Sequence, residues 1–186
     1  MPCYVTIPLS MKLLTLKFII IFIYLISSSS SYAIQTPNLK NLVIHKEPKK
    51  LEKINFKNVN NENINLNKFK DSLIIINFWA TWCAPCIEEM PSLNRLQLNP
   101  NFNNLQIIPI NVGRENIEKS KNFYKKLNIN NLEIYFDKNV ELVNKFLLRG
   151  LPTTIFINKK GEEFARIIGF VNFDDKKIIK WLKQYD

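Results

Sequence analysis

The stretch from Ser72 to Cys86, SLIIINFWATWCAPC, indicates the architecture of this chain. Its first eight residues form an apolar run of strand length. Such a run is typical of a strand covered on both faces, and so of a parallel sheet with helices on each side. Cys83 and Cys86 follow directly, and apolar residues then recur at helical spacing from Ala84 to about Gln97. The sequence therefore places both cysteines between a buried strand and the first turn of a helix.

Strand and helix patterns alternate along the rest of the chain, and two adjacent strands near its end form a hairpin. We expect the following further strands and helices. They are a short hairpin at 54–56 and 64–66, strands at 105–112, 132–136, 153–157 and 163–168, and helices at 116–127, 140–148 and 174–183. This layout is an α/β fold with a mixed central sheet flanked by helices and an N-terminal hairpin extension.

The chemistry of this chain is expected at Cys83 and Cys86. Two cysteines three positions apart at a helix start can reach disulfide distance. The free amide hydrogens and the positive end of the helix dipole would favour a thiolate at Cys83. We expect Cys83 to attack first and Cys86, one turn further in, to resolve the resulting mixed disulfide.

Other uses of a cysteine pair fit less well. A zinc site would usually need two more Cys or His ligands, and His45 and Cys3 are the only other residues of these types in the sequence. Ile87 stands where covalent haem attachment requires histidine, and a disulfide across two residues removes little unfolded-state entropy. We therefore expect no metal and no cofactor. A copper-binding delivery protein and a non-catalytic interaction domain remain as alternatives.

The residues FWATWCAPC at 78–86, with GLPTT about 65 residues further on, resemble the thioredoxin superfamily. The resemblance is closest to its exported TlpA, ResA and CcmG-type members, and it covers roughly residues 51–186. It implies that Pro152 is a cis-proline facing the disulfide and that the backbone of Leu151 pairs with an extended substrate. It also implies that Trp82 shields Cys83 and contacts partners, whereas Trp79 is expected in the core.

Further positions refine this resemblance. Asn77 stands where cytoplasmic thioredoxins carry a buried Asp, and Asn cannot titrate. Glu89 lies three residues after Cys86 on the same helix face, where ResA-like proteins have Glu. The resemblance implies that Glu89 is a general acid/base for the resolving thiol. Thr153 and Thr154 stand where CcmG-type proteins carry an acidic residue.

The resemblance implies an exported thiol:disulfide oxidoreductase that reduces protein disulfides such as those of apocytochrome c. Its electrons would come from a membrane thiol reductant of the CcdA or DsbD type. The substrates would therefore be protein thiols and disulfides in an oxidising, extracytoplasmic compartment such as the periplasm.

The N-terminus indicates export. The apolar run from Leu13 to Ile26 would span about 21 Å as a helix, short of the roughly 30 Å of a bilayer core. We expect residues 1–33 to be a signal peptide cleaved after Ala33, or else an uncleaved membrane anchor. Residues 34–50 are expected to be a linker and residues 51–186 the domain. Because Lys12 directly precedes the apolar run, Met11 rather than Met1 is a candidate start.

The chain is basic, with 26 Lys and Arg against 16 Asp and Glu and a formal net charge of +10. Nucleic-acid binding proteins cluster such residues, because each phosphate contact releases counterions. Here the basic residues form only short doublets, such as Lys49-Lys50 and Lys125-Lys126. We therefore expect no nucleic-acid partner.

Overall fold

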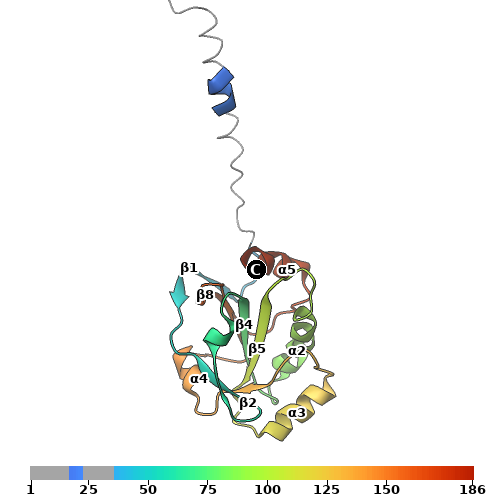
Figure 1. The fold of residues 1–186 in the computed structure, drawn as a ribbon. Coiled ribbons are helices and arrows are strands. Elements are labelled where there is room, and N and C mark those ends of the chain that lie inside the picture. The colour runs from blue at the N-terminus through green and yellow to red at the C-terminus, as the bar shows by residue number, and fades with distance from the viewer. Residues whose placement is uncertain (1–16, 23–35) are drawn as a thin grey trace, which may run out of the picture. The chain divides into compact units, whose positions relative to one another are not determined.

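A computed structural model describes residues 17–22 and 36–186 of the chain (Figure 1). Residues 17–22 form a helical segment, and Gln35–Asp186 is a separate compact unit. Within these described ranges, no helix has both the length and the apolar character needed to cross a bilayer. The predicted cleavage after Ala33, the Met11 start and Cys3 all lie outside the described residues.

The compact unit is built on one mixed sheet of eight strands in the order β1-β8-β7-β4-β5-β6-β2-β3 (Figure 1). The strands are β1 Leu42–Lys50, β2 Asn55–Asn58, β3 Asn63–Asn65, β4 Leu73–Trp79, β5 Leu105–Asn111, β6 Tyr135–Phe136, β7 Thr153–Ile157 and β8 Glu162–Ile168. Central β4 pairs parallel with β5 and antiparallel with β7. The predicted α/β fold with a mixed sheet is confirmed.

Helices cover both faces of this sheet. They are α2 Ala84–Leu96, α3 Ile117–Lys126, α4 Glu141–Lys145 and α5 Lys176–Leu182, with short 3₁₀ turns at Leu66–Phe69 and Lys183–Tyr185. Alternate residues of β4 enter two different cores: Ile75 packs in the core shared with α2, α3 and α5, and Ile76 in the core shared with α4 and β2. All seven residues of β4 are buried for this reason.

The interpretation of residues 34–50 as a linker is wrong for its larger part, because Leu42–Lys50 forms edge strand β1. This strand pairs antiparallel with β8, with Leu42 opposite Ile167, and the register shifts between Ile44 and Lys49. Most of its side chains are exposed, so no apolar period marks it as a strand. A polar contact links the side chains of this strand to β8, because His45 Nε2 lies 2.8 Å from Glu163 Oε1.

Most other expected elements form within a few residues of their predicted ends. The hairpin is present as β2 and β3. Because β2 also pairs with β6, the hairpin forms one edge of the sheet. The strand expected at 132–136 is reduced to two residues, and the helix expected at 140–148 to five. Pro91 lies inside α2.

Candidate active site

The structure joins Cys83 and Cys86 in a disulfide with an S–S distance of 2.03 Å. Cys83 is the N-cap residue of α2, and its sulfur accepts a hydrogen bond from the Cys86 N–H at 3.3 Å. Its carbonyl also accepts from the Cys86 and Ile87 N–H groups. Pro85 stands in the first turn, where backbone N–H groups have no acceptor within the helix, so the missing N–H of proline costs no hydrogen bond. The local sequence therefore starts the helix and places the Cys83 sulfur at its positive end.

The two cysteines differ little in exposure, at 5% for Cys83 and 1% for Cys86. Nearby Trp82 is 64% exposed, whereas Trp79 is fully buried in the core, as expected. Trp79 packs on the ring of Phe123 with ring centroids 4.7 Å apart. Trp82 is therefore free to meet another molecule beside the disulfide.

The Leu151–Pro152 peptide bond is cis, as the resemblance implied. The next residue, Thr153, pairs with Phe78 near the end of β4, and the Pro152 carbonyl accepts from the Gly169 N–H at 2.7 Å. Leu151 is half-buried against the core. This loop therefore lies at the sheet end from which the cysteine loop departs.

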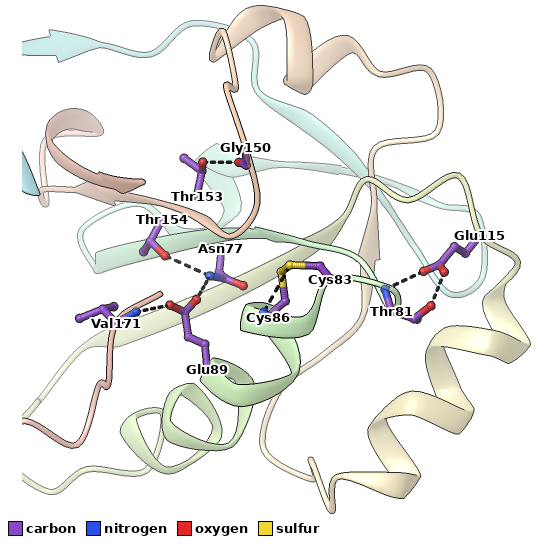
Figure 2. Close-up of a disulfide and its surroundings, with 10 residues drawn as sticks. All are labelled: Asn77, Thr81, Cys83, Cys86, Glu89, Glu115, Gly150, Thr153, Thr154 and Val171. Atoms are coloured by element: carbon purple, nitrogen blue, oxygen red, sulfur yellow. Dashed lines mark hydrogen bonds between the residues drawn. A yellow bond between two sulfur atoms is a disulfide. The ribbon is translucent and has the colours of Figure 1, made fainter. Parts of the chain in front are cut away.

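Glu89 is 1% exposed and is held by two neutral donors. Its carboxylate accepts from Asn77 Nδ2 at 2.7 Å and from the Val171 N–H at 2.8 Å, and Asn77 Nδ2 also donates to Thr154 Oγ1 (Figure 2). Burial raises the pKa of Glu89 from 4.5 to about 8, against the lowering effect of these hydrogen bonds. A carboxyl group with that pKa can gain or lose a proton near neutral pH.

A second carboxylate, Glu115, was not predicted from the sequence. It accepts hydrogen bonds from both the backbone N–H and the hydroxyl of Thr81, two residues before Cys83 (Figure 2). The sequence shows only an acid in the loop before a helix, a position at which acids are common. Its contact with Thr81 depends on the side-by-side pairing of β4 and β5, which no local pattern reveals.

Among residues 17–22 and 36–186, no three His, Cys, Asp or Glu side chains gather in a way that could hold a metal ion. The chemistry that the described residues offer is centred on two sulfur atoms, with a protonatable carboxyl group one helical turn away. Fold and site together define a protein with the thioredoxin fold and its Cys-x-x-Cys disulfide.

More particularly, the chain belongs to the AhpC/TSA family, whose match covers residues 48–162. The thiol-disulfide oxidoreductase ResA of Bacillus cereus strain ZK is 32% identical over 106 residues, 57% of this chain and 60% of that protein. ResA of Geobacillus kaustophilus is 31% identical over 110 residues, 59% of this chain and 62% of the relative. The chain therefore spans about 60% of the length of these curated relatives.

Solved structures agree on the fold. A putative thiol:disulfide interchange protein DsbE from Chlorobium tepidum superposes with a TM-score of 0.63 at 20% identity, over 74% of this chain and 98% of that one. The exposed lipoprotein thioredoxin Etrx1 of Streptococcus pneumoniae gives 0.61 at 24% identity, over 72% and 99%. At this identity the likeness identifies the thioredoxin fold and nothing finer.

Proposed function

We propose that this protein is an exported thiol:disulfide oxidoreductase that reduces protein disulfides with the Cys83/Cys86 pair. The observation that carries the proposal is the Cys83–Cys86 disulfide at the N-terminus of α2, with the Cys83 sulfur in the N-cap position. The Cys86 N–H that points at this sulfur, together with the helix dipole, stabilises negative charge there once the disulfide is reduced.

The reaction begins with the pair reduced. The Cys83 thiolate attacks one sulfur of a partner disulfide, forming a mixed disulfide and releasing the partner's other sulfur as a thiolate. Cys86 then loses its proton and attacks the Cys83 sulfur. This second step expels the partner's remaining thiolate and closes the Cys83–Cys86 disulfide. Two electrons have passed to the partner, which leaves as a dithiol after taking up two protons.

In this proposal Glu89 manages the proton of Cys86. Its place one turn beyond Cys86 on α2 and its pKa near 8 suit a group that takes a proton during the second step. The carboxylate is held by Asn77 and Val171, so it stays in one position while its charge changes. Glu88, its exposed neighbour, has no part in the reaction.

The partner polypeptide meets the protein around the disulfide. Trp82 offers an exposed aromatic face beside Cys83, and Leu151 and Pro152 form the loop at the same end of the sheet. We propose that Trp82 packs on the partner and that the Leu151 backbone pairs with an extended segment of it.

The proposed compartment and the relatives support the proposed direction of electron flow. In an oxidising extracytoplasmic space, a pair that reduces others must itself be re-reduced, and we propose a membrane thiol reductant of the CcdA or DsbD type. The curated relatives named ResA support the placement in this branch. The substrate is a protein disulfide such as that of apocytochrome c, and the domain is either freed by cleavage near Ala33 or anchored by residues 1–33.

Reduction of insulin or oxidised apocytochrome c by the full chain tests the proposal. Cys83→Ser should abolish turnover, and Cys86→Ser should accumulate mixed disulfides whose partner, released by a reductant and identified by mass spectrometry, is the substrate. Cys3→Ser is the matched control and should behave as wild type. Turnover that persists in Cys83→Ser would contradict the proposal.

A further inference from the structure

The short loop between β4 and the disulfide is held by the burial of Ala80 in the core and by a side-chain hydrogen bond of Thr81. It comprises Ala80, Thr81 and Trp82, and Trp82 is exposed. Of these three side chains, only that of Thr81 makes a described hydrogen bond, and its partner is Glu115, in the loop between β5 and α3 (Figure 2). The position of this loop matters because the Cys83 N–H donates back to the Ala80 carbonyl at 3.2 Å.

Glu115 is bound as a fixed anion. One carboxylate oxygen accepts from the Thr81 N–H at 3.0 Å and from Asn111 Nδ2 at 2.9 Å. The other accepts from the Thr81 hydroxyl and from Lys119 Nζ, the latter at 2.8 Å. The Glu115 side chain is only 4% exposed. Burial alone would raise its pKa, but the hydrogen bonds from Lys119, Thr81 and Asn111 outweigh it and lower the pKa to about 2.

Gly113 gives independent support for a close fit. A Cβ atom at this position would come within 3.0 Å of Ala80 Cβ and within 3.1 Å of two side-chain atoms of Glu115. A side chain at this position would therefore push Ala80 or Glu115 away by a few tenths of an ångström. The Gly113 N–H donates at 2.8 Å to Asn111, which itself holds Glu115.

We propose that Glu115 is a positioning residue for disulfide exchange: it holds Thr81 so that the Cys83 sulfur stays in the N-cap position of α2. This inference rests on the proposed function. The connection runs from Glu115 to Thr81, through the Ala80–Cys83 turn, and on to the hydrogen bond from the Cys86 N–H to the Cys83 sulfur. If Thr81 is released, the turn loses this restraint, the sulfur is held less firmly at the helix end, and its thiolate loses stabilisation.

Positioning and simple charge repulsion predict opposite results, which makes the inference testable. Removing a nearby negative charge would, by Coulomb's law alone, favour the Cys83 thiolate and speed its reactions. Removing a positioning contact would disfavour the thiolate and slow them. Glu115→Gln keeps the size of the side chain but loses the anion that accepts from Lys119 and Thr81.

The experiment measures alkylation of reduced Cys83 by iodoacetamide in the full chain from pH 5 to 9, with each cysteine followed by mass spectrometry. We expect Glu115→Gln to slow the reaction at pH 7 by about 3- to 10-fold and to move the half-maximal rate to higher pH. Thr81→Val, which keeps the N–H and loses the hydroxyl, should give a smaller decrease. Glu118→Gln, the same charge change on the exposed first turn of α3, should match wild type.

Gly113→Ala is the second variant, because it disturbs the same contact without changing charge. It should slow alkylation in the same direction as Glu115→Gln, in protein whose thermal unfolding shows that it is folded. Wild-type or faster alkylation in Glu115→Gln would overturn the positioning role. If Cys83 of the wild type reacts no faster than an unstructured thiol, the proposed function itself has failed, a result distinct from the failure of Glu115 alone.

Discussion

Glu89 and Glu115 are two nearly inaccessible carboxyl groups near the same disulfide, and their surroundings give them opposite acidities. Burial raises the pKa of Glu89 to about 8, whereas hydrogen bonds lower the pKa of Glu115 to about 2. Glu89 receives two neutral donors, from Asn77 and Val171. Glu115 receives three neutral donors and the ammonium group of Lys119. One group can therefore exchange a proton near pH 7, and the other cannot.

A third carboxylate shows which factor decides whether the pKa of a buried carboxyl group is raised or lowered. Glu163 is 2% exposed, about as buried as Glu89, yet its pKa is lowered. Burial would raise it, but hydrogen bonds from Arg166 and His45 outweigh that effect. Arg166 binds both carboxylate oxygens, at 2.7 and 2.9 Å. The donors that each group receives, four at Glu115 and the cation Arg166 at Glu163, thus separate these two carboxylates from Glu89 more than exposure does.

The largest expected effect comes from removing that cation. Arg166→Met should leave Glu163 as a buried charge with only His45 beside it and lower the free energy of unfolding at pH 7 by about 3 to 5 kcal/mol. The deficit should shrink toward pH 5, because Glu163 can then take up a proton. Urea unfolding at both pH values measures it, with exposed Arg149→Met as the control. A loss under about 1 kcal/mol, the size expected of a surface pair, would mean that Arg166 is not what offsets the burial of Glu163.

Glu89 tests the case of a buried carboxyl group that receives only neutral donors. Its folded-state pKa lies above its unfolded value, so its contribution to stability is complete below about pH 4.5 and is lost as pH rises through 8. Glu89→Gln cannot ionise and should be more stable than wild type at pH 9 by about 2 to 4 kcal/mol, with little difference at pH 5. Urea unfolding of the oxidised protein across this range checks the prediction.

Glu88→Gln, on the same helix but exposed, is the matched control for Glu89→Gln and should follow the wild-type curve. Parallel pH curves for Glu89→Gln and wild type would mean that Glu89 keeps an ordinary pKa in the folded protein. The contrast with Glu115 would then be lost.

Glu115 should show the reverse pH dependence. Its folded-state pKa is below its unfolded value, so it stabilises the fold above about pH 4.5 and stops doing so as pH falls through 2. Glu115→Gln should lower the free energy of unfolding at pH 7 by about 2 to 3 kcal/mol, with the difference closing toward pH 2. Glu118→Gln serves again as the control. A constant difference at all pH values would point to lost packing rather than lost charge.

The central features of this molecule could be predicted from its sequence because their signals are local. The buried run of β4 and the cysteine spacing indicated the sheet centre and the disulfide, and the resemblance supplied the cis bond before Pro152. The catalytic role of Glu89 stays a prediction. Each of these depends on residues close together in the chain or on a motif that the family shares.

The features that could not be predicted depend on contacts between distant residues. Strand β1 has few apolar residues because it lies at the sheet edge, and it is held through His45 to Glu163, 118 positions away. Glu115 contacts Thr81 because β5 lies beside β4. Edge strands and polar contacts across strands leave no periodic pattern in a single sequence.

The smallest expected effect concerns Lys119, the cation that pairs with Glu115. Its side chain is 57% exposed, so water screens the pair, and Lys119→Met should cost only about 0.5 kcal/mol, less at high salt. Lys121→Met, on the same helix, is the control. After this change three neutral donors still hold Glu115, and its stabilising effect should persist well below pH 4.5. A loss as large as that of Arg166→Met would mean that exposure does not limit a cation's contribution here, and that Glu115 and Glu163 belong to one class.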